Sequence, residues 1–438
     1  MNFYKTIGYT SIYTAINMLA SLLITKVTAK LLGPEGTAMM GQFSNAVAAL
    51  TILASAAIGT GVVKYISENK NNKVEFEKYI ATAFGITFFC SGIITIFVVC
   101  FHRWLGVKAF SSHEFDLIFL LYGVSLVLNT TNLLLGQILN GLAEIKKLTT
   151  VNIITSVANL VLTINFAIKF GIWGALLASV AVSCTGFFFM LLLIRKMDWF
   201  RRKILFGGID FKIARQYSEF SLMSVVFLVS PFVLIIIRDF LTKNLSLEQA
   251  GLWQGMMKIS DTYLNFIVSI LTVYYVPRFS EIHDTNELVI EMRKGFKRIM
   301  PLVIVLSFSI WLCRDLIISL LLSPKFVPMR DLFALNLLGD VFKVAGYLFV
   351  YVLVAPMFAH KITKANITTM ITYQVVLLGS NLFFVKKFGL IGTSYACLLT
   401  MIVYLFTAMY FTRQLVVATK KSIAPNSLKQ NFKNFLKK

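Results

Sequence analysis

The feature that most constrains this chain is a series of long apolar runs that fill most of its 438 residues. An α-helix needs about 20 apolar residues to cross a bilayer. Hydrophobic residues make up 57% of the chain and charged residues only 14%, whereas a soluble domain carries about 25% charged residues. The pattern predicts an all-α polytopic membrane protein with twelve transmembrane helices. The predicted spans are 8–31, 37–66, 79–101, 117–140, 148–169, 172–194, 218–241, 249–276, 298–322, 331–356, 363–385 and 389–412.

Ten charged side chains nevertheless lie inside these runs. They are Lys26, Lys30, Arg238, Asp239, Lys258, Asp261, Arg314, Asp315, Asp340 and Lys343. A charge at the centre of a membrane helix costs about 2.5 to 3.5 kcal/mol, so five deep charges would cost about 13 to 18 kcal/mol. We therefore expect these groups to line a hydrated cavity or to pair across helices. Six cations against four anions leave a net positive charge, which favours an anionic ligand.

The spacing of these charges predicts which of them share a helix face. Lys26 and Lys30 are four residues apart and should project from one side of their helix. Lys258 with Asp261, and Asp340 with Lys343, are three residues apart and should also share a face. Lys30, Arg238, Asp239 and Arg314 lie near span ends. For these four residues, reaching the polar interface is an open alternative.

A short internal repeat divides the chain into halves. The run Lys169-Phe170-Gly171-Ile172-Trp173-Gly174 recurs, displaced by 218 residues, as Lys387-Phe388-Gly389-Leu390-Ile391-Gly392. Both copies join the last two spans of a six-span half, which predicts two parallel repeats. The expected organisation is a six-helix bundle at 1–195, a linker at 196–217, a second bundle at 218–412 and a basic tail at 413–438.

The placement of Lys and Arg predicts the orientation in the membrane. The net charge is +22, and the cations gather in alternate loops, as the positive-inside rule requires for cytoplasmic loops. We therefore expect both termini in the cytoplasm and no nucleic-acid partner. The five cysteines and four histidines form no ligand pattern, so the sequence predicts no metal site and no cofactor.

Several short runs occur in an order and spacing that resembles a known family. They are Leu32-Gly33-Pro34-Glu35-Gly36, Gly251-Leu252-Trp253-Gln254-Gly255, Ile259-Ser260-Asp261-Thr262-Tyr263-Leu264, Trp311-Leu312-Cys313-Arg314-Asp315, Met329-Arg330-Asp331-Leu332-Phe333-Ala334 and Gly339-Asp340-Val341-Phe342-Lys343-Val344. Over residues 1–415 the chain resembles the Wzx flippases. These are polysaccharide transporters of the multidrug/oligosaccharidyl-lipid/polysaccharide (MOP) superfamily, whose fold is MATE-like. The branch it is most similar to handles O-antigen or enterobacterial common antigen units.

The resemblance implies a function as well as a fold. It implies two six-helix bundles around a cationic central cavity, in a multi-pass protein of the bacterial inner membrane. The cargo would be an undecaprenyl-pyrophosphate-linked oligosaccharide, moved from the cytoplasmic to the periplasmic leaflet by alternating access. The implied partners are this lipid-linked substrate, membrane lipids and a polysaccharide polymerase or chain-length complex, while the oligomeric state stays open. The chain would not be an enzyme.

Each in-span charge has an expected role in that hypothesis. The cations Lys26, Arg238, Lys258, Arg314 and Lys343 would bind the pyrophosphate, with Lys30 as a weaker candidate. The aspartates Asp239, Asp261, Asp315 and Asp340 would hold these cations in place or couple transport to an ion. Two alternatives remain at this point: an ion-coupled exporter of small molecules with the same fold, and a membrane glycan polymerase or ligase. Short outer loops disfavour the enzyme. A first span without Asp or Glu disfavours the exporter.

Overall fold

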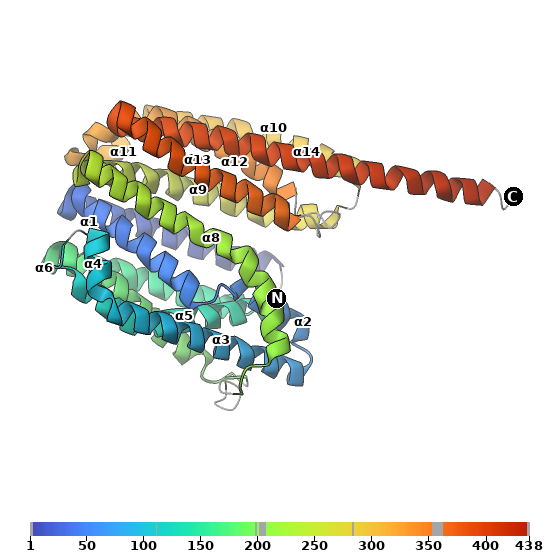
Figure 1. Cartoon of the computed structure of the whole chain (residues 1–438), viewed down its shortest axis with the longest axis horizontal. Coiled ribbons are helices and arrows are strands. Elements are labelled where there is room, and N and C mark those ends of the chain that lie inside the picture. Colours follow the sequence, from blue (N-terminus) through green and yellow to red (C-terminus); the bar gives the residue numbers. More distant parts are fainter. Residues whose placement is uncertain are drawn as a thin grey trace. The chain divides into compact units, whose positions relative to one another are not determined.

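The computed structural model describes residues 3–110, 112–197, 199–200, 207–282, 284–352 and 362–435, and these residues form helices and short connections without any strand (Figure 1). The helices of the first half are α1 (Phe3–Ala54), α2 (Gly59–Asn69), α3 (Lys73–Cys100), α4 (His102–Phe110), α5 (Asp116–Gly141) and α6 (Ile145–Ile194). Those of the second half are α8 (Phe211–Asn244), α9 (Leu247–Glu281), α10 (Thr285–Leu312), α11 (Arg314–Leu321), α12 (Phe333–Val352), α13 (Ile362–Phe388) and α14 (Gly392–Phe435). Two short 3-10 segments are η1 (Pro324–Leu332) and η3 (Gly389–Ile391).

The predicted all-α membrane fold is confirmed. Seven helical stretches among the described residues are long and apolar enough to cross a membrane. Three of these, Ile12–Ala54, Ile145–Ile194 and Ala365–Val417, each overlap two of the predicted spans. The predicted spans 218–241 and 249–276 lie on α8 and α9, whose 34 and 35 residues give a length of about 50 Å at 1.5 Å per residue.

Glycines in the left-handed region mark the turns inside the long helical stretches. Gly33 (φ 67°) separates the first two predicted spans within α1, and Gly171 (φ 59°) separates two spans within α6. Gly389 (φ 63°) stands between α13 and α14. A residue with a side chain is strained at such a φ, whereas glycine is not. Gly171 and Gly389 occupy the same position in the two copies of the repeat, and the chain reverses direction at both of them.

The repeat also recurs in the packing of these two turns. A Cβ added at Gly174 would overlap the backbone carbonyl of Phe166, and a Cβ added at Gly392 would overlap that of Phe384. Both members of each pair are displaced by 218 residues from their counterparts, as the repeat requires. The predicted internal repeat is thus confirmed at this turn, where the close approach of two helices leaves room only for glycine.

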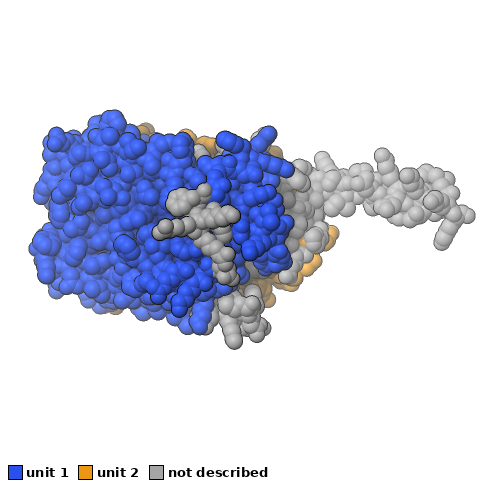
Figure 2. All heavy atoms as spheres, turned by 90° about the horizontal axis from the view of Figure 1, so that it is seen from below, with its two compact units in different colours: residues 1–254, 318–327 blue, residues 255–317, 328–438 orange. Residues whose placement is uncertain are grey.

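The chain packs as two compact units, coloured separately in Figure 2. Unit 1 comprises Met1–Gln254 with Ile318–Val327, and unit 2 comprises Gly255–Ile317 with Pro328–Lys438. Unit 1 thus takes in α8 and the start of α9, which the repeat assigns to the second half. The division expected from the repeat, 1–195, 196–217, 218–412 and 413–438, follows chain symmetry and stays a prediction.

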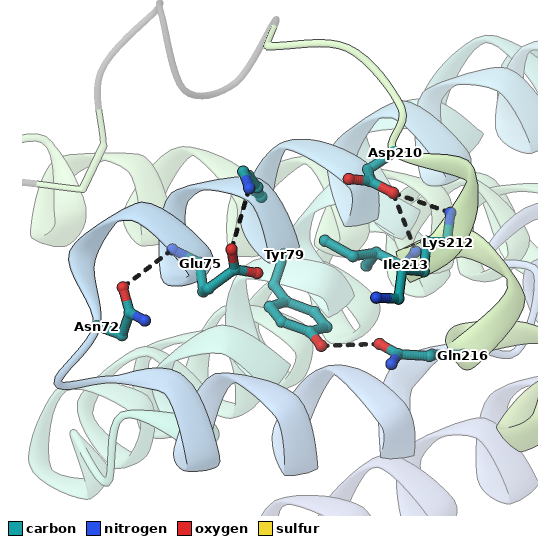
Figure 3. A network of polar contacts seen from close by, with 8 residues as sticks. Asn72, Glu75, Tyr79, Asp210, Lys212, Ile213 and Gln216 are labelled. Carbon is teal, nitrogen blue, oxygen red and sulfur yellow. Dashed lines mark hydrogen bonds and ion pairs between the residues drawn. The ribbon is translucent and has the colours of Figure 1, made fainter.

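Polar contacts explain why the start of α8 packs with the first half. The Asp210 carboxylate caps α8 by accepting from the backbone N–H groups of Lys212 (2.8 Å) and Ile213 (3.3 Å) (Figure 3). The Asp210 backbone N–H in turn donates to the Thr82 hydroxyl of α3 at 3.1 Å. The expected linker 196–217 is therefore helical from Phe211 onward, while its residues 201–206 lie outside the described part.

A cluster of tyrosines strengthens this junction. The Tyr79 hydroxyl donates to the Gln216 side-chain oxygen at 2.7 Å (Figure 3), and the buried Tyr217 hydroxyl donates to the Tyr79 carbonyl at 3.2 Å. Tyr65 of α2 stacks on Tyr79 with ring centroids 5.2 Å apart. These contacts close the end of an apolar core formed by α2, α3, α5, α6 and α8. The start of α8 is thus anchored on the first-half helices.

Candidate functional site

The ten in-span charges differ in their exposure. Lys26, Lys30, Lys258, Asp261 and Asp315 are exposed, and Asp239, Arg314 and Lys343 are half-buried. Arg238 and Asp340 are buried, with 3% and 2% of their surface exposed. Exposed cations can meet a ligand directly, whereas buried charges need partners within the protein. The ten residues therefore differ in what they need: Arg238 and Asp340 each require partners inside the protein, whereas the exposed residues do not.

Arg238 of α8 is held inside unit 1 by neutral groups. Its Nη1 donates to the Gln42 side-chain oxygen of α1 at 2.9 Å, and its Nη2 donates to the Gln254 side-chain oxygen of α9. The guanidinium also lies over the Trp253 ring, 5.5 Å from its centroid. The buried Arg238 Nε has no hydrogen-bond partner within the described residues. A full positive charge is thus buried against two amides and an aromatic face.

Close packing supports this arrangement at Gly41, the residue before Gln42. A Cβ at Gly41 would lie 2.5 Å from the Gln254 Cδ and 2.8 Å from the Arg238 Nη2. Both distances are shorter than a non-bonded contact allows. Glycine at this position therefore lets α1 approach the guanidinium and its amide partner.

Asp340 of α12 is buried inside unit 2. Its Oδ2 accepts a 2.7 Å hydrogen bond from the Tyr263 hydroxyl of α9. The buried Ser260 of α9 also lies near this carboxylate. Lys343, one turn further along α12, lies near both Asp340 and Asp261 of α9. Asp340 therefore lies toward α9, and the face that it should share with Lys343 stays a prediction. This anion has one hydroxyl donor and a nearby cation.

Aromatic hydroxyls complete the surroundings of Lys343. Tyr347 of α12, Tyr373 of α13 and Tyr404 of α14 lie near the Lys343 ammonium group. The Tyr404 ring lies edge-on to both of the other two, with centroids 5.9 Å from Tyr347 and 5.8 Å from Tyr373. Unit 2 thus holds a polar cluster built by four helices.

Three of the other charges, Asp239, Arg314 and Asp315, have partners close to helix ends. The Asp239 carboxylate accepts from Lys243 one turn along α8, with the two atoms 2.8 Å apart. Arg314 donates to the Trp311 carbonyl at 2.9 Å and lies over the Trp311 ring. Asp315 pairs with Arg330 of η1 at 3.1 Å. These three residues thus contact partners near helix ends and not partners at the centre of a helix bundle.

Two of the predicted spans are interrupted in the structure. The expected span 37–66 is divided between α1, which ends at Ala54, and α2, which begins at Gly59. The expected continuous span 298–322 is two helices, because α10 ends at Leu312 and α11 begins at Arg314. Arg314 and Asp315 therefore start a new helix instead of lying within one. An uninterrupted apolar sequence does not reveal such a break, since the residues on both sides favour a helix equally.

Four residues that sequence reasoning did not assign to the site contact its charges: Gln42, Trp253, Gln254 and Tyr263. Polar residues in apolar spans were a signal for the two glutamines, although such residues also serve as ordinary interhelical contacts. The five cysteines are free. The described residues contain no group of three His, Cys, Asp or Glu side chains that could hold a metal ion.

The fold defines a membrane protein of the MATE-like class. The structure matches an inward-facing multidrug resistance MATE family transporter of the MOP superfamily with a TM-score of 0.77 and 15% identity, covering 95% of this chain and 99% of that one. An outward-facing structure of such a transporter matches with a TM-score of 0.70 and 16% identity, covering 96% of this chain and 97% of that one.

Sequence comparison narrows the class to a family. Residues 3–283 match the family described as polysaccharide biosynthesis protein, which is more than half of the chain. The chain belongs to this family. It is also 29% identical over 411 residues to the lipid III flippase of Escherichia coli (strain K12), which covers 92% of this chain and 96% of that protein.

Proposed function

We propose that this protein is a flippase that carries an undecaprenyl-diphosphate-linked oligosaccharide of O-antigen or common-antigen type from the cytoplasmic to the periplasmic leaflet. The observation that carries the proposal is the near full-length similarity to a lipid III flippase, in a chain whose apolar spans contain exposed cations. The protein moves its substrate without chemical conversion. It lies in the bacterial inner membrane with both termini in the cytoplasm, as its alternating basic loops favour.

The diphosphate is the part of the substrate that these cations suit best. Lys26 and Lys30 form an exposed pair on one face of α1, and Lys258 is exposed on α9. A lysine ammonium acts as a compact charge toward phosphate, whereas an arginine such as Arg314 can bind two phosphate oxygens at once. In this mechanism the cations hold the diphosphate and glycan in a hydrated cavity, while the polyprenyl chain stays in lipid.

Its partners in this proposal are the lipid-linked oligosaccharide, membrane lipids and a polysaccharide polymerase or chain-length complex that receives the flipped product. The aspartates have two roles. Asp340 keeps Lys343 in place within unit 2, and Asp261 lowers the net positive charge near Lys343. Transport by alternating access then needs both leaflet-facing states of the same protein.

The MATE-like fold favours one second candidate, an ion-coupled exporter of small cationic molecules. Such a function would require an acidic group deep in the first bundle. The predicted first span 8–31 contains Lys26 and Lys30 but no Asp or Glu. A cationic cargo would be repelled by this face, so the charge pattern favours an anionic one.

Reconstitution tests the proposal directly. Purified protein in liposomes should move a lipid-linked oligosaccharide to the leaflet where an added glycosidase or lectin can reach it. Lys26→Glu should lower the flipping rate at least about tenfold, which corresponds to about 1.4 kcal/mol. Lys70→Glu, the same change at an exposed position in the α2–α3 connection, should leave the rate unchanged. The proposal fails if the wild-type protein exports a cationic dye but leaves the lipid-linked oligosaccharide in place.

A further inference from the structure

Arg238 stands apart from the other buried groups because its charge has only neutral partners. Its two side-chain hydrogen bonds go to Gln42 and Gln254, and its Nε edge is buried without a partner in the described part of the chain. A buried unpaired charge is costly, so its retention points to a partner that arrives during the functional cycle.

Through its hydrogen bonds to the two glutamines, Arg238 connects three helices. Gln42 lies on the second part of α1, after the Gly33 turn, and Gln254 lies two turns into α9. Arg238 itself is six residues from the end of α8. The guanidinium therefore joins a first-half helix to two second-half helices near the end of unit 1 that contains Gly33, here termed the Gly33 end.

Direct packing closes this Gly33 end. A Cβ at Gly251, near the start of α9, would overlap the backbone carbonyl of Pro34 in α1. The Ser323 hydroxyl, buried in unit 1, donates to the Ala29 carbonyl at 3.2 Å. The Lys325 Cδ lies 3.6 Å from the Cβ position of Gly33. First-half and second-half segments are thus in van der Waals contact here.

We propose that Arg238 is a diphosphate-operated latch of the Gly33 end. The latch is closed when the guanidinium holds Gln42 and Gln254, and it opens when a diphosphate takes the guanidinium from them. The bonds to Gln42 and Gln254 have only one charged partner, whereas a diphosphate adds an opposite charge and can bind the guanidinium in a bidentate manner. The opposite charge is what favours the exchange. The exchange also leaves α1 and α9 without their common tie, so that substrate binding releases the closed end.

This inference rests on the proposed function and adds to it a substrate-driven step. In the orientation expected for this chain the Gly33 end faces the periplasm. The empty protein then keeps that side closed, and only a bound diphosphate frees it. A ligand that lacks the diphosphate leaves Arg238 on its amides and the end closed. The latch thus selects substrates by headgroup, since neutral and cationic molecules carry no anionic group that could replace the two amides at the guanidinium.

Gln254→Glu is the sharpest test because it changes one group and keeps the shape. A carboxylate in place of the amide would form an ion pair with Arg238 that a diphosphate can no longer displace. We expect the flipping rate in liposomes to fall at least about tenfold at unchanged protein level, although every cation is retained. Gln249→Glu, five residues earlier on α9, introduces the same charge without an Arg238 contact and should flip at the wild-type rate. Equal flipping by wild type and Gln254→Glu would overturn the latch.

A distance measurement separates the latch from the proposed function. Glu35 and Glu248 are exposed beside Pro34 and Gly251, so nitroxide labels at Glu35→Cys and Glu248→Cys report on the Gly33 end. The background is a variant without the five native cysteines that retains flipping. In nanodiscs, undecaprenyl diphosphate should lengthen the distance between the labels, whereas undecaprenol should not. With Gln254→Glu the distance should stay short.

The outcomes of the two assays are distinguishable. If the wild-type protein flips substrate but undecaprenyl diphosphate leaves the label distance unchanged, the latch is refuted and the flippase function stands. If the distance lengthens but liposomes show no flipping, the latch stands and the proposed function fails. A distance that lengthens equally with undecaprenol would show that the lipid tail and not the diphosphate releases the end, which would also refute the latch.

Discussion

Arg238 and Asp340 are both buried charges in apolar helices, but unit 1 and unit 2 accommodate them differently. Arg238 has two neutral amides, the Trp253 ring and one unpartnered nitrogen among the described residues. Asp340 has the Tyr263 hydroxyl as a donor and Lys343 on the next turn of its own helix. The anion is fully accommodated within its unit, whereas the cation is not. A buried charge whose hydrogen bonds are all formed stabilises the fold. We expect a buried charge that lacks a partner to exchange its contacts more readily.

The difference predicts opposite consequences for substitutions at the two positions. Removing Asp340 should leave its partners buried and unsatisfied, so the cost should appear as lost stability. Removing Arg238 should relieve a buried charge, so the cost should appear in transport. The comparison is therefore testable by measuring unfolding and flipping on the same variants.

The largest stability effect should follow Asp340→Ala. The buried Tyr263 hydroxyl would lose its acceptor, and Lys343 would lose one of its two nearby carboxylates. Deleting one member of a buried charged network costs about 3 kcal/mol. We expect a clear decrease in the unfolding midpoint in detergent micelles, measured by thermal or denaturant titration. Asp239→Ala removes a half-buried carboxylate that is paired only within its helix. It should change the free energy of unfolding by less than about 0.5 kcal/mol.

An unchanged midpoint for Asp340→Ala would break the comparison, since it would mean that the carboxylate contributes nothing to the fold. In that case Asp340 would be as exchangeable as Arg238, and its role in ion coupling would become the better explanation for its burial.

Tyr263→Phe should have a smaller effect of the same kind. It removes one hydrogen bond to a charged acceptor, a contribution of about 1.5 to 3 kcal/mol, but leaves Ser260 and Lys343 beside the carboxylate. We expect about 2 kcal/mol in the same unfolding assay. Tyr395→Phe, on the partly exposed Tyr395 of α14, is the matched control and should be neutral. If the two variants unfold alike, the 2.7 Å contact does not stabilise unit 2.

The sequence predicted the fold far better than the surroundings of its charges. Apolar run length predicted the membrane helices, because the bilayer fixes the length of a span. The turn glycines Gly171 and Gly389 were found from the repeat alone, since a reversal between two packed helices restricts that position to glycine. The break at Cys313 was missed, because residues that favour a helix lie on both sides of it.

The candidate site was predicted only as a set of charges. Spacing along one helix predicts that Asp340 and Lys343 share a face, because helical periodicity fixes that relation. It could not indicate that Arg238 is buried while Lys26 is exposed, since burial depends on which other helix approaches. The approach of α1 to Arg238 depends on Gly41, and a single glycine has no distinctive pattern in an apolar span. Whether the exposed cations bind the substrate stays a prediction.

The smallest stability effect should follow Arg238→Met, although the residue is as buried as Asp340. Methionine fills similar volume, and removing the guanidinium relieves its burial without leaving an opposite charge behind. The loss of two hydrogen bonds offsets that gain, so the free energy of unfolding should stay within about 1 kcal/mol of the wild-type value. Flipping of lipid-linked oligosaccharide should nevertheless decrease at least about tenfold, because the guanidinium that binds the diphosphate is gone. Arg238→Lys keeps the charge but not the two-pronged geometry, so it should flip at an intermediate rate. A loss of stability for Arg238→Met as large as that of Asp340→Ala would show that both charges are structural, and the distinction between the two units would fail.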